Sequence, residues 1–288
     1  MTGHRFQLIC RRNLLRLFWL FTLIPAVLFS VKCGSWDLQV SWSEVSTAIS
    51  GNSSDVKILL IRHLLLPRSL GAIVLGVVLS MLARKPQFAG SRGNWLIFDA
   101  SALTFAVNWL LTLTAVHTLI PLSVSILAVL GYLKLLKKIP FFFYGTVLLL
   151  CAFIWLPHNT GRTLPATLCG DLFYCRSEAL SPCILLIFAA ALADRFKKFS
   201  FLSDCAASLD IAALSGIAGA VPGISYLSKI KFIPPWWSVA MALLFFDTIL
   251  RQFFQAPGAG LLLLTLGCGA ALWEIRQKKI RTDATDAE

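Results

Sequence analysis

The chain has 288 residues, of which 57% are hydrophobic and 14% are charged, and its formal net charge is +12. A soluble domain is about half apolar and a quarter charged, so this composition argues against a soluble protein and predicts an all-α, polytopic membrane protein with one domain over residues 1–288. The basic residues stand in short clusters between apolar runs, which is the pattern of cytoplasmic loops, so the positive charge does not indicate a nucleic-acid-binding protein.

The first apolar run, 14–33, follows a basic N-terminus with Arg5, Arg11 and Arg12 and carries Arg16 near its start. No small-residue cleavage site follows the run. The pattern therefore predicts a first membrane span with a cytoplasmic N-terminus, and not a cleaved signal peptide.

A polar stretch, 34–55, separates the first apolar run from the second. Within it, Ser43-Glu44 precedes the apolar residues Val45 and Ile49. This order predicts the start of a short amphipathic helix that lies on the outer face of the membrane.

About eight apolar runs approach the roughly 20 residues that cross a bilayer. The predicted spans cover 14–33, 58–83, 95–116, 119–136, 140–156, 179–193, 234–254 and 258–275. Basic clusters at 84–92, 134–138, 195–198 and 276–281 mark the cytoplasmic ends. Both chain termini are therefore predicted to lie in the cytoplasm.

One apolar segment, 211–228, is broken by four residues that interrupt helices: Gly216, Gly219, Pro222 and Gly223. A full crossing here would place the basic C-terminal tail outside, so charge favours a re-entrant segment. Broken backbone at membrane depth is tolerated where it lines a cavity, which predicts that these four residues line a transport pathway. A small-residue packing face between helices is the alternative, and both interpretations stay open.

Several site types have no support in the sequence. The four histidines are dispersed and no CxxC motif is present, so no metal, cofactor or catalytic site is predicted. No phosphate-binding Gly-x-x-x-x-Gly-Lys-Ser/Thr loop is present either, so the chain is not expected to be an enzyme that hydrolyses ATP itself. Cys169 and Cys175 share one polar loop, where either a disulfide or two free thiols fits.

Leu66-Pro67-Arg68 places an arginine beside a proline, ahead of the glycine-spaced apolar run 69–80. At the mouth of a membrane span, a charge costs little free energy only where it reaches water or an acidic partner. Arg68 is therefore a candidate for an interaction site.

Four stretches, in this order along the chain, carry a family resemblance: Ile61-Arg62 with Leu66-Pro67-Arg68 and Gly76, then Arg84-Lys85-Pro86, then Phe199 to Ile211, then Asp247-x-x-x-Arg251 with Pro257-Gly258. Together they resemble the FecCD family, the permease subunits of ABC importers for iron-siderophores, haem and vitamin B12. The chain resembles a shortened, divergent member, because the family norm is ten spans and the family's Pro-His after the glycine-rich segment is missing here.

The resemblance implies a permease subunit in the bacterial inner membrane that works with partner proteins: a second permease copy or paralogue, a cytoplasmic ABC ATPase and a periplasmic substrate-binding protein. It also implies that Arg68, Arg251 and Arg62 dock acidic residues of the binding protein, since guanidinium forks bind carboxylates. The alternatives are that Arg62 and Arg68 extend to the membrane surface, and that Asp247 and Arg251 pair on one helix face.

The resemblance further implies a cytoplasmic segment, about 195–210, that couples to the ATPase. Its candidate contact residues are Phe201, Leu202, Ser203, Asp204, Ala207, Ser208 and Leu209. An interfacial helix that touches anionic lipid through its basic flank is the alternative.

Two other functions stay open. A non-transporting membrane scaffold derived from a permease fits the shortened chain. An ion-coupled secondary carrier would need a buried carboxylate or histidine within a span, and the candidates Asp99, His117 and Asp247 are each predicted near a span end or loop.

Overall fold

The computed structural model describes residues 2–34, 38–51, 53–85, 88, 90–112, 119–136, 200–214, 220–221 and 233–253, with scattered residues from 266 to 280. Over these residues the chain forms helices and no strand, which confirms the all-α prediction. The elements are α1 (Thr2–Cys33), α2 (Trp42–Ser50), α3 (Val56–Leu60), η1 (Ile61–Leu65), α4 (Leu66–Ala83), α5 (Gly90–Thr112), α6 (Leu119–Gly131), η2 (Tyr132–Leu136), α9 (Ser200–Leu214) and α11 (Pro235–Phe253).

One described helix is long and apolar enough to cross a bilayer by length and composition. It is the continuous run α3–η1–α4, Val56–Ala83, whose 28 residues extend about 42 Å. Shorter apolar helices cover Leu17–Cys33, Trp95–Phe105, Ser123–Lys134 and Pro235–Ile249. The predicted spans 140–156 and 179–193 lie outside the described residues, and only scattered residues of 258–275 are described.

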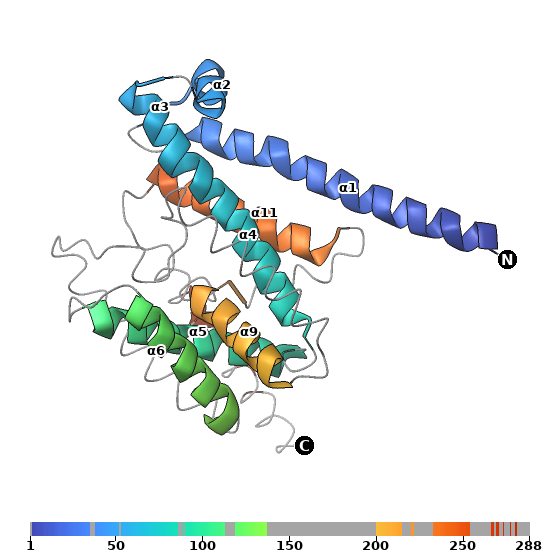
Figure 1. The fold of residues 1–288 in the computed structure, drawn as a ribbon, viewed down its shortest axis with the longest axis vertical. Coiled ribbons are helices and arrows are strands. Elements are labelled where there is room, and N and C mark those ends of the chain that lie inside the picture. The colour runs from blue at the N-terminus through green and yellow to red at the C-terminus, as the bar shows by residue number, and fades with distance from the viewer. Residues whose placement is uncertain are drawn as a thin grey trace.

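The helices pack in two groups along α4 (Figure 1). At one end, α1 and α11 pack on α4, with α2 and α3 beyond them. At the other end, α5, α6 and α9 pack on one another, and α5 and α9 contact α4. The helix α4 therefore connects the two groups.

The directions of α1, α4 and α11 follow from their side-chain contacts. Near the start of α11, the Trp237 indole donates to Thr22 Oγ1 at 2.9 Å, and near its end Gln252 donates to the carbonyl of Cys33. These contacts make α11 parallel to α1. Arg68 contacts Asp247 whereas Gly76 lies against Ala240, so α4 runs antiparallel to α11.

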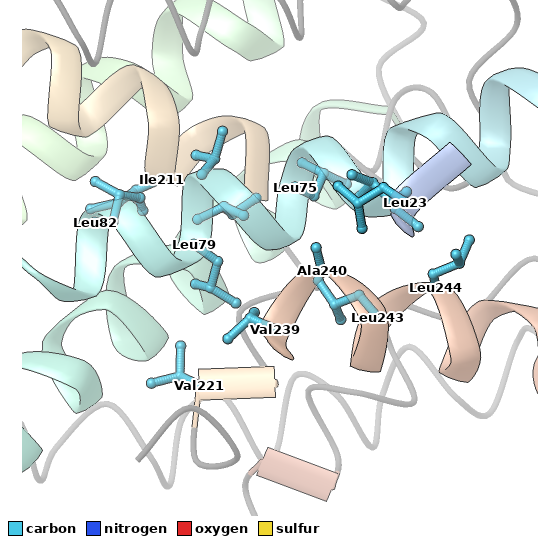
Figure 2. Packing of buried hydrophobic residues seen from close by; sticks show 14 of the residues in the cluster. Leu23, Leu75, Leu79, Leu82, Ile211, Val221, Val239, Ala240, Leu243 and Leu244 are labelled. Carbon is cyan, nitrogen blue, oxygen red and sulfur yellow. The ribbon is translucent and has the colours of Figure 1, made fainter. Parts of the chain in front are cut away.

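The α4–α11 contact is built on small residues and a leucine-rich core. A Cβ placed on Gly76 would lie 2.5 Å from Ala240 Cα, so glycine permits this close approach of the two backbones. Figure 2 shows Leu75 and Leu79 of α4 near Val239 and Leu243 of α11. Close helix approach at small residues is the usual packing of helices in membranes.

The predicted short helix after the first apolar run is confirmed as α2, and its place on the outer face of the membrane stays a prediction. It starts one residue before Ser43, because Ser41 is the N-cap: its hydroxyl accepts from the Glu44 amide at 3.3 Å, and its own amide donates to Glu44 at 2.6 Å. Val45 and Ala48 are buried, whereas Ile49 is exposed.

An ion pair ties α2 to α3. Lys57 Nζ lies 2.6 Å from Glu44 Oε1, and this hydrogen bond, with those from Ser41, lowers the pKa of Glu44 to about 2. A carboxylate with a depressed pKa stabilises the folded state fully above its ordinary pKa near 4.5, and this contribution is lost as the pH falls through the folded value.

We therefore expect the difference in stability between the wild type and Glu44→Gln to shrink as the pH falls from about 5 to about 2. Thermal unfolding of both proteins across this pH range measures the difference. A difference that stays constant would show that Glu44 does not act through its charge.

Candidate functional site

Arg68 lies within a long continuous helix and not beside a loop. Its place at the mouth of a membrane span stays a prediction. The helix begins at Val56, capped by Asp55, whose carboxylate accepts from the Lys57 amide at 2.9 Å. Arg68 is twelve residues further on, about 18 Å along the axis. The position of Arg68 within the helix, and not a place beside a loop, therefore decides which groups its side chain contacts.

A π-helical turn, η1, allows the helix to continue through Pro67. Proline has no N–H and its ring clashes with the carbonyl four residues earlier, so it usually kinks or ends a helix. Here the turn before it is widened, and the Leu66 amide donates to the Ile61 carbonyl, five residues back. Single π turns of this kind often occur at functional sites.

Arg68, Asp247 and Arg251 form a buried ion cluster, which we call the arginine cluster. Arg68 Nε donates to Asp247 Oδ1 at 2.7 Å, and Arg251 Nε lies 3.0 Å from Asp247 Oδ2. Their side chains are 9%, 0% and 2% exposed for Arg68, Asp247 and Arg251, respectively. One carboxylate of α11 is thus shared by a guanidinium of α4 and a guanidinium of its own helix.

Three hydroxyl groups surround the Arg251 end of the cluster. Arg251 Nη2 lies within hydrogen-bond distance of Ser30, Ser69 and Thr248, and it also donates to the Ser30 carbonyl at 3.3 Å. The Ser30 hydroxyl lies 2.7 Å from Thr248 Oγ1 and 3.1 Å from Ser69 Oγ. These contacts join α1, α4 and α11 at one point.

The three predicted docking arginines have different surroundings. Arg68 and Arg251 are buried together, which confirms the pairing of Asp247 with Arg251 and adds Arg68 to it. Arg62 is exposed and donates to the carbonyl of Gly51, at the end of α2, at 3.3 Å. Docking to a binding protein stays a prediction for all three, and in this conformation only Arg62 lies on the surface.

Residues 200–210 of the predicted coupling segment fold as part of α9, which continues past Asp210 to Leu214, and residues 195–199 lie outside the described residues. Ala207 and Ser208 are buried, whereas Ser203, Asp204 and Leu209 are partly exposed. The side chains of Phe201 and Leu202 lie outside the described residues. Contact with an ATPase stays a prediction, and the partly exposed side chains are the ones that such a contact would use.

Other predicted sites fall outside the described residues. Among these are the candidate pathway residues Gly216, Gly219, Pro222 and Gly223, and also Cys169, Cys175 and His117. Between the candidate pathway residues, only Ala220 and Val221 are described, and Val221 is buried.

Three carboxylates are completely buried, and the sequence did not predict their burial. Asp99 lies within α5, Asp210 within α9 and Asp247 within α11. The Tyr132 hydroxyl donates to Asp99 Oδ2 at 3.1 Å. Asp99 and Asp247 are both buried, nine and twelve residues after the first residues of α5 and α11. Their place near a span end stays a prediction. The apolar neighbours of Asp99 are the signal that would have indicated a buried carboxylate.

The rest of the described chain offers no second kind of site. Within the described ranges, no three His, Cys, Asp or Glu side chains form a group that could hold a metal ion. No protein-family model, curated protein or solved structure matches this chain. The FecCD resemblance therefore rests on the four sequence stretches and stays a prediction.

Proposed function

We propose that this chain is the membrane-spanning permease subunit of a binding-protein-dependent ABC importer in a bacterial inner membrane. The cargo is proposed to be a ferric siderophore or a related iron chelate, with haem and vitamin B12 as further members of the same cargo class. ATP hydrolysis takes place on a separate cytoplasmic ATPase, and a second permease copy or paralogue completes the pathway.

The observation that carries the proposal is the contact between two of the four stretches. The Leu-Pro-Arg stretch and the Asp-x-x-x-Arg stretch are 179 residues apart, yet Arg68 and Asp247 form a direct ion pair. The two stretches therefore lie side by side in the fold. Their contact supports a shared architecture in which both stretches belong to one site.

The helix directions also support the proposed topology. With the N-terminus inside, α1 runs outward, so the parallel α11 also runs outward and the antiparallel α4 runs inward. A re-entrant 211–228 agrees with an outward α11, whereas a full crossing there would reverse it. The basic tail after 276 then returns to the cytoplasm, as the distribution of positive charge favours.

Uptake by whole cells tests the proposal. A strain without this chain is given iron-labelled siderophores, labelled haem and labelled cobalamin, and the same strain is restored with the wild-type gene. We expect lost uptake of one cargo, its recovery on restoration, and its block by arsenate, which depletes ATP. If the deletion changes the uptake of none of these cargoes, the transport proposal is contradicted and the scaffold alternative remains.

Arg62→Glu is expected to weaken docking of the binding protein by roughly tenfold, because it places a carboxylate opposite the partner's acidic residues. Binding-protein-stimulated ATP hydrolysis in the reconstituted complex measures the effect. His63→Glu, at the next and also exposed position of the same helix, is the control for a general change of surface charge. An unchanged stimulation in Arg62→Glu would remove Arg62 from the docking site.

A second candidate, an ion-coupled secondary carrier, is favoured by the buried carboxylates Asp99, Asp210 and Asp247. Ionisable residues within a membrane domain commonly mark ion or proton pathways. In the same uptake assay, this function predicts a block by a protonophore and continued uptake with arsenate. The two energy sources therefore separate the two candidates.

A further inference from the structure

The hydrogen bonds of the arginine cluster are incompletely satisfied at Arg251. All of its hydrogen bonds are made by Nη2, and Nη1 has no hydrogen-bond partner although it is buried. Nε lies 3.0 Å from Asp247 Oδ2. A buried charged group with an unmade hydrogen bond costs free energy that water or another partner would recover. Nη1 is the nitrogen of Arg251 that would gain such a partner if the cluster opened.

The cluster lies close to the ends of two helices. Arg251 is two residues before the end of α11, and Ser30 is three residues before the end of α1. Each distance is less than one helical turn, or under about 5 Å along the axis. A small separation of these two helix ends would therefore break the contacts between Arg251 and Ser30 of α1.

The rest of the α4–α11 contact allows such a separation. Towards the other end of the pair, Gly76 and Ala240 hold the backbones in close apolar contact, which forms a tight pivot. On the other side of the cluster, the π turn η1 interrupts the regular hydrogen bonding of the long helix. A fixed pivot on one side and an irregular turn on the other permit movement at the cluster between them.

We propose that the arginine cluster is a conformational latch, in which Asp247 holds Arg68 and Arg251 inside the protein and opening exposes both guanidinium groups beside the ends of α1 and α11. The latch follows from the geometry of the cluster, whatever the protein transports. It adds to the proposed function a closed state in which two of the predicted docking arginines are withheld from any partner.

Arginine-selective labelling tests the latch. The purified full-length protein in lipid nanodiscs is treated with phenylglyoxal, and the modified arginines are quantified by mass spectrometry. The exposed Arg62, six residues before Arg68 on the same helix, is the internal reference. If the open state is the minor state, populated to about 0.1–10%, Arg68 and Arg251 should react roughly 10- to 1,000-fold more slowly than Arg62.

Two variants decide whether this reaction reports the latch. Asp247→Asn should bring the labelling of Arg68 and Arg251 to within about tenfold of Arg62, because the shared carboxylate no longer holds them. In a Cys33→Ser background, Ser30→Cys with Thr248→Cys should form a disulfide across the 2.7 Å hydroxyl contact, abolish the labelling of Arg251, and release it on reduction.

Hydrogen exchange of the α9 amides, measured in the same samples, reports global unfolding at a distance from the cluster. The latch is overturned if Arg251 reacts only at the rate at which α9 opens, or if the disulfide leaves its labelling unchanged. If Asp247→Asn does not fold, the disulfide variant still tests whether the latch opens, because this variant retains Asp247.

Discussion

Asp247→Ala is expected to lower the free energy of unfolding by about 3–5 kcal/mol, the usual cost of removing one partner from a buried ion pair. The substitution leaves Arg68 and Arg251 buried without their shared carboxylate, at side-chain exposures of 9% and 2%. The three hydroxyls near Arg251 are neutral, so they cannot replace the charge. Denaturant unfolding of the purified protein, followed by circular dichroism, measures the change.

The control replaces the whole cluster by apolar residues of similar size: Arg68→Met, Asp247→Leu and Arg251→Met together. Well-packed apolar residues often stabilise a protein as well as a buried ion cluster does. We therefore expect the triple variant to regain most of the stability that Asp247→Ala loses. If Asp247→Ala is as stable as the wild type, the cluster is open or hydrated in the ground state.

Local features of the fold were predictable from the sequence. The helix α2 follows from a serine, a glutamate and apolar spacing, all within nine residues. The pairing of Asp247 with Arg251 follows from a spacing of four residues on one helix. The all-α class follows from composition, since the hydrophobic content and the long apolar runs require helices in a membrane.

The contact of Arg68 with Asp247 was not predictable, because no local rule relates residues that are 179 positions apart. The sequence pattern placed Arg68 at the mouth of a span, ahead of the glycine-spaced run 69–80. The π turn, through which the helix continues past Pro67, leaves no composition signal of its own. The burial of Asp210 was missed likewise, because α9 continues beyond the segment where the sequence suggested a boundary.

Gly76→Ala is expected to lower the free energy of unfolding by about 1–3 kcal/mol, because added volume in a packed contact forces the backbone apart. The new Cβ would lie 2.5 Å from Ala240 Cα and 2.8 Å from the Ala240 amide nitrogen. Both are backbone atoms, so no side-chain rotation relieves the clash, and α4 and α11 must separate. Denaturant unfolding of the two proteins measures the difference.

Gly131→Ala is the matched control, because a Cβ at Gly131 meets no atom within 4 Å. The same chemical change in a helix without a clash should stabilise the protein by up to about 1 kcal/mol. Equal effects of the two substitutions would mean that the Gly76–Ala240 contact does not hold α4 to α11. In that case the arginine cluster would lack its pivot, and Arg251 should be labelled at the same rate in Gly131→Ala and in Gly76→Ala.

If the pivot holds, Gly76→Ala alone should speed the labelling of Arg251. The opening of the arginine cluster would then depend on the packing of Gly76 against Ala240.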